Sequence, residues 1–460
     1  MATPTQVVEV RRRRSIFGPV VLIGLGIVML MVTMGRLNAR TAAYFFAQYW
    51  PLIIIFWGLV KLYEHMRARH EGYPPPGIGA GGIVLLIFVL LIGTASSGIY
   101  RGTRNMDWSR VRDEMNMPDD EFGGLFGTKF DFTSNIDQEF PAQGSLKVTS
   151  NRGSIKVSPS SDGKLHVVVK KSIYANSQEE ANRINTEGPP QINVVDNTLT
   201  LDASRAYKNG GLVDLEILAP KKAALDLMTL RGKIEVLGRT GDVKAHNSRG
   251  DVTLEDVTGN TTVHVRGGSL SARHITGDLT MEGRVEDTKV SDLTGVLTLQ
   301  GEFLGEMQLS NIGKGFRFKS SRTDMEAVRL DGSLNMSGGD LRANALTGPF
   351  HIVTRSKDIH LEDVSGDIKV ENTNGEVEVH PKGPVGNIEI RDRKGDIRLT
   401  LPANGNFVMD ATSAHGELTS DFTLTTENKH GEARASGTVN KGGAHVQLNN
   451  EHGNISIRKQ

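Results

Sequence analysis

Two pairs of adjacent carboxylates are the residues of this sequence best suited to acid–base chemistry. Glu255-Asp256 and Glu362-Asp363 lie in two closely similar stretches, GDVTLEDVTG from Gly250 and KDIHLEDVSG from Lys357. Glycoside hydrolases place two carboxyl groups around the scissile bond, so a polysaccharide-acting enzyme is one hypothesis. Both pairs occupy the same point of a repeated unit, which a turn or a solvated face would also show. We favour that structural interpretation and predict no catalytic residue.

Histidines and aspartates recur at positions that could hold a metal ion. His415, His430 and His452 each precede a glycine near the end of the chain, and stacked copies would lie about 5 Å apart. A metal site would need them within one coordination sphere, so a column of turn residues is the better interpretation. The GGxGxD repeat of calcium-binding solenoids is missing, and we predict no metal and no cofactor. Aspartates occupy equivalent places in five units: Asp242, Asp251, Asp278, Asp367 and Asp396.

Two short motifs have simpler explanations than the functions that they suggest. Arg249–Asp251 spells the RGD cell-attachment tripeptide, but it is one register of the repeat. Gly77–Gly82, GIGAGG, could be taken for a dinucleotide-binding loop, but no strand precedes it and an apolar stretch follows. The sequence has no Walker loop, nucleophile elbow or HExxH motif. It also has no cysteine, which excludes disulfides, thiolate metal sites and cysteine nucleophiles.

A short repeat positions these residues and dominates the second half of the chain. Each unit is a glycine, often an acidic residue, and then an apolar–polar–apolar run. The units start about nine residues apart between 232 and 277 and again between 339 and 375. Fixed spacing of this kind indicates a stacked repeat architecture. Examples are GDVKA at Gly241, GDVTL at Gly250, GDIKV at Gly366 and GEVEV at Gly375.

Alternation of apolar residues within each unit predicts strands. Val252 and Leu254 would share one face of a strand, as would Ile359 and Leu361. Nine residues are too few for a closed coil, so two units of about 18 residues would form one rung of a flattened β-solenoid. Antiparallel hairpins are the alternative, although hairpins have no reason to keep a nine-residue register. We predict parallel strands in a right-handed coil.

The balance of charge limits the partners of the protein. Lysine plus arginine and aspartate plus glutamate both number 53 among 460 residues. A chain without net charge has no basic field to attract nucleic acid, so no nucleic-acid partner is expected.

The N-terminal hundred residues predict a membrane region of three α-helices. Spans are expected at about 16–35, 41–60 and 78–99, each long enough to cross the hydrocarbon layer. A signal peptide is the alternative for the first, but the apolar run is long and no small-x-small cleavage site ends it. The four arginines Arg11–Arg14 favour a cytoplasmic N-terminus, which would place everything after Tyr100 outside.

The rest of the chain is expected to divide at changes in this pattern. Residues 101–135 read as a juxtamembrane linker and 136–460 as the β-solenoid. The solenoid would have an irregular first part at 136–230, regular repeats at 231–400 and a C-terminal cap at 401–460, because terminal repeats must cover an exposed core edge. Ser177 and Glu180 form a capping box, which predicts one helix over SQEEANRINTE.

Residues 140–460 resemble the bacterial putative-adhesin family, a β-strand-repeat family of unknown function. The resemblance is carried by SNRGSIKV, GDVTLEDVTG, GDIKVENTNGEVEV and GGAHVQLNNEHGNISI. It implies a parallel β-helix, and it brings no catalytic residues. The membrane part resembles the region shared by LiaI/LiaF-type envelope-stress proteins, on YWPLIIIFWGLVKL at Tyr49–Leu62. Those proteins usually suggest four helices where this sequence shows three, so the side of the membrane that the β-domain faces stays open.

Together these observations predict a multi-pass protein of the bacterial inner or cell membrane with an extracytoplasmic β-domain. The expected role is non-catalytic binding or scaffolding in the cell envelope, in the manner of an adhesin. The lipid bilayer is one partner, and an envelope glycan or protein is another. The first alternative is an envelope-stress regulator acting on a sensor kinase or another membrane partner. The second is a polysaccharide-acting β-helix enzyme.

Overall fold

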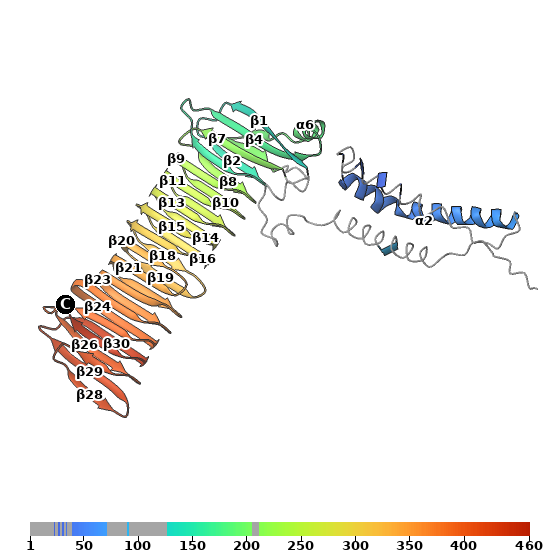
Figure 1. Ribbon diagram of the computed structural model, residues 1–460. Helices are drawn as coiled ribbons and strands as arrows, with labels where there is room; N and C mark the ends of the chain where they lie inside the picture. The colour runs from blue at the N-terminus through green and yellow to red at the C-terminus, as the bar shows by residue number, and fades with distance from the viewer. Residues whose placement is uncertain are drawn as a thin grey trace, which may run out of the picture. The chain divides into compact units, whose positions relative to one another are not determined.

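The computed structural model describes residues 39–70, 127–204 and 211–460, with isolated positions between 23 and 34 and at 90–91. The chain divides into two compact units, Met1–Pro118 and Asp119–Gln460. In the first unit, α2 (Ala39–His70) contains Pro51 and covers the second predicted span (Figure 1).

The predicted membrane spans can be compared with the structure only in part. Within the described residues, no helix is apolar over a sufficient length to cross a membrane. The prediction of three spanning helices is therefore not supported by this part of the chain. The spans predicted at 16–35 and 78–99 lie almost entirely outside the described residues.

The second unit is built almost wholly of strands. Its first part comprises β1 (Thr128–Gln138), β2 (Ser145–Ser150), β3 (Ile155–Pro159), β4 (Leu165–Ala175), α6 (Gln178–Glu187), β5 (Gln191–Val195), β6 (Thr198–Ala203) and β7 (Leu212–Ala219). The regular part begins with β8 (Ala224–Thr229), β9 (Ile234–Arg239), β10 (Val243–Asn247), β11 (Val252–Thr258), β12 (Thr261–Val265), β13 (Leu270–Thr276), β14 (Leu279–Val285), β15 (Thr288–Leu293), β16 (Leu297–Phe303) and β17 (Met307–Ile312).

The remaining strands complete a continuous hydrogen-bonded array of 31 strands. They are β18 (Phe316–Lys319), β19 (Thr323–Ala327), β20 (Arg329–Met336), β21 (Asp340–Thr347), β22 (Phe350–Thr354), β23 (Asp358–Asn372), β24 (Val377–Lys394), β25 (Ile397–Leu401), β26 (Phe407–Ser413), β27 (Leu418–Ser420), β28 (Thr425–Lys429), β29 (Glu432–Val439), β30 (Ala444–His452) and β31 (Ile455–Lys459).

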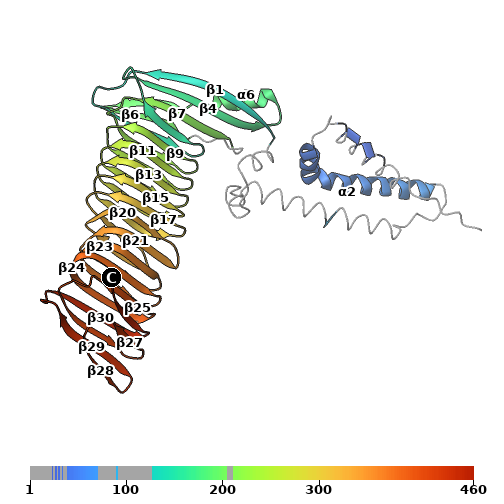
Figure 2. The same cartoon turned by 60° about the vertical axis from the view of Figure 1, so that its left-hand side comes forward.

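The strands form two faces that are joined by turns along two edges (Figure 2). Face A contains β8, β10, β12, β14 and β16, and face B contains β9, β11, β13, β15 and β17. Edge 1 is the row of turns from face A to face B, such as 248–251, and edge 2 is the row that returns. In face B, Val252 pairs in parallel with Ile234 and Leu270, each 18 residues away. The prediction of an 18-residue rung with parallel strands is confirmed for this part of the chain.

The alternating apolar residues of both faces fill one core. Val252 and Leu254 of face B and Val243 and Ala245 of face A are all at most 1% exposed. Their intervening polar neighbours point outward, as a period of two requires. Stacking therefore buries apolar surface that no single short strand could bury alone.

The predicted run of regular parallel repeats over 231–400 is interrupted in the middle. β18 and β19 form an antiparallel hairpin in face A, and β20 and β21 form one in face B. β19 and β20 consequently run against their neighbours β22 and β17. The antiparallel hairpins considered as the alternative are thus present between β18 and β21. Here the spacing between the glycines loosens, and tight turns let the chain double back within a face.

At both ends of the stack, the spatial order of the strands differs from their order in the sequence. The rung of β2 and β3 lies between the rung of β6 and β7 and the rung of β8 and β9. At the other end, β30 lies between β24 and β26, and β31 lies between β25 and β27. The last strands of the predicted cap, 401–460, are therefore an interior rung.

Antiparallel strands border one end of the array and face A of the other end, where face B ends at β27 in a parallel pair with β31. β1 pairs with β4 and β5 pairs with β6 at one end, and β28 pairs with β29 at the other. β1 begins at Thr128, so the strands start inside the segment 101–135 that was predicted to be a linker. The predicted helix is confirmed as α6, where the Ser177 hydroxyl accepts a hydrogen bond from the Glu180 amide at 3.2 Å.

Candidate binding surface

The two predicted carboxylate pairs lie on the outward side of face B. Glu255 forms an ion pair with Arg273 of the next strand, and the Asp256 carboxylate lies 3.1 Å from Nδ1 of His274. Asp256 and Asp363 both have a positive φ, of 54° and 52°. Aspartate tolerates this left-handed conformation better than most residues, so the carboxylate pair marks a backbone irregularity that the repeat preserves.

The two copies are too far apart to act together on a glycosidic bond. Glu255 and Glu362 occupy one column of face B, with β13, β15, β17, β20 and β21 between their strands. Six steps of about 4.8 Å separate them by roughly 29 Å. Glycoside hydrolases place their two carboxyl groups about 5–9.5 Å apart.

The repeated aspartates bond to the backbone of the neighbouring rung. The carboxylate of each accepts a hydrogen bond from a main-chain amide of the next rung at 2.8–2.9 Å. An Asp after the turn glycine thus satisfies an amide that the strand ladder leaves open. Across the described residues, no group of acidic and histidine side chains is arranged to hold a metal ion. The pairs are Asp242 with Asn260, Asp251 with Ser269, Asp278 with Val296, Asp367 with Asn387, and Asp396 with Asn454.

The same bond explains the RGD tripeptide. Asp251 uses its carboxylate within edge 1 to bond the amide of Ser269. The tripeptide is therefore a turn of the repeat, as the sequence indicated.

Two of the three C-terminal histidines form the expected column. The rings of His415 and His452 stack with their centroids 4.8 Å apart and their planes 28° apart. His430 lies elsewhere, at a left-handed position in the turn between β28 and β29. Insertion of β30 and β31 into the stack is what brings His452 beside His415.

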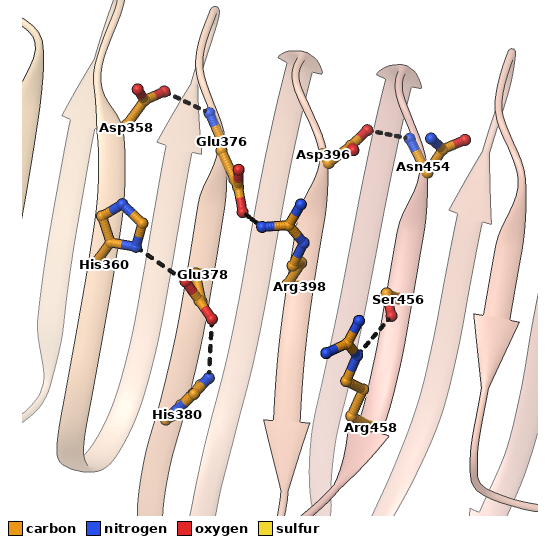
Figure 3. Close-up of polar contacts among 10 residues, drawn as sticks. All are labelled: Asp358, His360, Glu376, Glu378, His380, Asp396, Arg398, Asn454, Ser456 and Arg458. Atoms are coloured by element: carbon orange, nitrogen blue, oxygen red, sulfur yellow. Dashed lines mark hydrogen bonds and ion pairs between the residues drawn. The ribbon is translucent and has the colours of Figure 1, made fainter.

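The outward side of face B carries a denser polar network near the C-terminal end (Figure 3). The Glu378 carboxylate lies 3.0 Å from Nδ1 of His360 and 3.3 Å from Nε2 of His380. Glu376 forms an ion pair with Arg398 on the adjacent strand, and Arg458 donates to Ser456 at 3.4 Å. We call His360, Glu376, Glu378, His380, Arg398, Ser456 and Arg458 the face B network.

The sequence carried a signal for this network that we did not use. Outward positions on adjacent parallel strands are neighbours, so residues 18 to 22 apart form pairs. Paired in this way, Glu378 lies beside His360 and Glu376 beside Arg398, so acidic and basic side chains alternate along the face. Such pairs are half-exposed, and each contributes little to stability. They do leave a flat surface on which both signs of charge and many hydrogen-bonding groups are presented.

Aromatic side chains do not contribute to this surface. No tryptophan follows Trp108 in the sequence, and the tyrosine in the described strands, Tyr174, is 2% exposed. A site that stacks sugar rings would use an exposed aromatic face. Charge pairing and hydrogen bonding are the interactions that the face B network offers.

A column of buried polar side chains lies beneath edge 1. Asn247 donates to the carbonyls of Gly232 and Gly250 at 2.9 Å, and Asn450 donates to the carbonyl of Gly395 at 2.7 Å. These amides satisfy turn carbonyls that point into the stack. This column was not predicted from the sequence, although an Asn three residues before the turn glycine is its signature.

Asp392 occupies one place in that column. Its side chain is 5% exposed, and it lies between Asn372 and Asn450 on the two neighbouring strands. Burial raises the pKa of Asp392 to about 6, although the amides of Arg393 and Lys394 oppose the shift by donating to its carboxylate. One oxygen each of Asn372, Asp392 and Asn450 has no hydrogen-bond partner.

Arg239 is a second buried charge with a structural role. It is 1% exposed, and burial lowers its pKa to about 10. Its guanidinium donates to the carbonyls of Ala219, Pro220 and Ala223 at 2.6–3.0 Å. These bonds close the turn between β7 and β8.

Solved structures of low similarity cover much of the chain. A putative cell adhesion protein from Clostridium sporogenes ATCC 15579 has 9% identity and a TM-score of 0.15, over 72% of this chain and 100% of that one. A putative adhesin from Bacteroides fragilis NCTC 9343 has 12% identity and a TM-score of 0.19, and one from Parabacteroides distasonis ATCC 8503 has 11% and 0.17. Both cover 72% of this chain and 97% of their own. No curated protein matches.

Two families match consecutive parts of the sequence. The LiaF transmembrane domain matches residues 17–102, and Toastrack DUF4097 matches residues 145–458. The first match indicates association with a membrane, and the second covers the stacked strands. Both resemblances seen in the sequence are thereby confirmed, and the chain belongs to the Toastrack DUF4097 family, with a LiaF transmembrane domain preceding the strands.

Proposed function

We propose that this protein is a non-catalytic scaffold of the bacterial cell envelope, anchored by its N-terminal unit and binding a partner through its stacked strands. The observation that carries the proposal is the outward side of face B. There the face B network presents acidic and basic side chains next to one another on a flat, regular surface. Such a surface suits a partner with complementary charges, because charge patterns confer specificity and register on an interface.

The match to the LiaF transmembrane domain at 17–102 favours a second candidate function. In that candidate, the membrane unit associates with a sensor kinase or another envelope-stress component, and the strands sense or transmit. The scaffold candidate requires the second unit to lie outside the cytoplasm, whereas the regulatory candidate takes its place if that unit lies in the cytoplasm. The two candidates also differ in which unit makes the contact with the partner.

The first test determines on which side of the membrane the strands lie. Because the sequence contains no cysteine, a single introduced cysteine provides the thiol that is labelled. Ala403, an exposed residue after β25, and His65, an exposed residue of α2, are replaced by cysteine in separate variants. Spheroplasts are then treated with a membrane-impermeant maleimide. We expect labelling of Ala403→Cys alone. Labelling of His65→Cys alone would place the strands in the cytoplasm and overturn the scaffold proposal.

The partner contact is tested with a photo-crosslinking amino acid in the full-length chain. Thr400 lies on the outward side of face B beside Arg398, and Leu62 is exposed on α2. Irradiation of cells with the probe at Thr400 should give an adduct of defined mass, and Glu378→Lys should remove it. An adduct from Leu62 but none from Thr400 would favour the regulatory candidate instead.

A further inference from the structure

A notch in edge 1 joins three consecutive rungs near the C-terminal end of the stack. It has a volume of about 290 Å³ and is lined by Arg355, Ser356, Thr373, Asn374, Arg393 and Lys394. The first four follow β22 and the second half of β23, and Arg393 and Lys394 end the second half of β24. These three segments lie side by side in face A. Parallel register therefore brings three turns, and with them three cations, to one place.

The lining of the notch is positively charged. Arg355, Arg393 and Lys394 are all exposed, and no lining residue is acidic. Of the nearby acidic groups, Glu451 forms an ion pair with Nε of Arg393 at 3.3 Å, and Asp392 is buried beneath the turn. The contact with Glu451 holds the Arg393 guanidinium at the rim.

The neutral lining residues add donors to these charges. Ser356 and Thr373 each carry a hydroxyl, and Asn374 carries a side-chain amide. Even with Arg393 partly paired to Glu451, the cationic and neutral donors together exceed what a carboxylate with two oxygens can use. A phosphate group has more acceptor oxygens and more charge, and arginine matches its geometry with a planar fork of N–H donors.

Arginine also recurs in edge 1 nearer the other end of the stack. Arg231, Arg249 and Arg266 lie in the turns that follow β8, β10 and β12, and Arg284 lies near the end of β14. At the opposite edge, Thr240 and Thr294 lie in the turns of the same rungs, and Thr258 and Thr276 end β11 and β13. At these rungs edge 1 therefore carries more arginine than edge 2, and the notch is a hollow in edge 1.

We propose that the notch binds a phosphate-type oxyanion, supplied either by a soluble anionic polymer of the envelope or by a lipid headgroup. This assigns a ligand class to the envelope-binding role proposed above and rests on that role for the source of the ligand. It makes edge 1 a second contact surface, separate from the face B network. If the notch binds no oxyanion, the crosslink expected at Thr400 is unaffected, so each proposal can be refuted without the other.

The test uses the full-length chain purified in a nonionic detergent at low ionic strength. Inorganic tripolyphosphate is titrated calorimetrically, and binding to micelles doped with phosphatidylglycerol or with phosphatidylcholine is measured in parallel. The double variant Arg355→Gln/Lys394→Gln should bind at least about tenfold more weakly, because two charge-assisted contacts are lost. The control Lys289→Gln/Arg317→Gln removes the same two charges from exposed outward positions, and it should change affinity less than about twofold.

The two arms also identify the source. Tripolyphosphate binding that depends on the notch supports a soluble phosphate polymer. Notch-dependent binding only to phosphatidylglycerol micelles supports a lipid headgroup. Equal weakening in the notch and control variants would show that net charge alone attracts the anion and would overturn the proposal. Absence of binding in both arms would overturn it as well.

Discussion

Replacement of Asp392 by asparagine should stabilise the protein at neutral pH. The carboxylate lies 5% exposed in a column whose neighbours, Asn372 and Asn450, are amides with one unpaired oxygen each. An ionised carboxylate at this point has no buried cation to pair with, and it cannot donate to those oxygens. Asparagine keeps an acceptor for the amides of Arg393 and Lys394 and adds two N–H donors, as Asn247 does in its own turn.

The magnitude follows from the pKa of Asp392, which burial raises from 3.8 to about 6. An acid with a raised folded-state pKa contributes its full stability below the unfolded value, and that stability is lost as the pH rises through the folded value. A shift of this size corresponds to roughly 3 kcal/mol at most between pH 4 and pH 7. Asp392→Asn does not titrate, so we expect it to be more stable than the wild type by about 1–3 kcal/mol at pH 7.5. The advantage should shrink towards pH 4.5.

Urea unfolding of the full-length chain, followed by circular dichroism of the strands at both pH values, provides the measurement. Asp410→Asn, at an exposed position of β26, is the matched control and should change stability by less than about 0.5 kcal/mol. A variant less stable than the wild type at pH 7.5 would show that the carboxylate has a favourable partner, and the reasoning would be refuted. An advantage that stays the same at pH 4.5 would mean that titration is not its cause.

Two further substitutions test the rung itself, each by the midpoint of thermal unfolding. Val252→Asp places an unpaired charge in the core, where Val252 is fully buried, and should cost more than about 3 kcal/mol; Thr253→Asp on the outward side should cost less than about 0.5 kcal/mol. An unchanged midpoint for Val252→Asp would contradict the rung assignment. Gly250→Ala should cost about 2 kcal/mol or more, because Gly250 has a φ of 125° and a Cβ there would overlap the carbonyl oxygen of Gly232. The control Gly338→Ala has open space around the new methyl group and should be nearly neutral. Equal effects of the two substitutions would argue against the close packing of edge 1.

The regular rungs could be predicted from the sequence because each constraint recurs. The spacing of the glycines, the alternation after them and the 18-residue pairing all express the same stacking geometry. The aspartate after the glycine was expected to suit a turn, but its hydrogen bond to the next rung could not be foreseen from the residue pattern. That bond joins residues 18 apart, and it exists only when the stack is formed.

The departures from the repeat could not be predicted in this way. The hairpins β18–β19 and β20–β21 depend on where the chain reverses direction. Apolar and polar residues alternate in their strands as they do in the parallel strands, so the alternation does not reveal the reversal. The insertion of β30 and β31 depends on pairings between segments far apart in sequence. The face B network was missed for a related reason, because its residues are ordinary solvent-facing side chains until the register makes them neighbours.

The inserted rungs at the two ends solve a problem that every open stack of strands faces. A strand at the end of a parallel stack offers unpaired amides and carbonyls to another chain, which promotes aggregation. Here antiparallel strands border one end and face A of the other end, and the rungs β2–β3 and β30–β31 are inserted inside the stack. Each inserted rung is paired on both sides, so it cannot separate without breaking contacts with two other segments of the chain. The surface that we propose to bind a partner through charge can then stay open while the rungs near the ends are held in place.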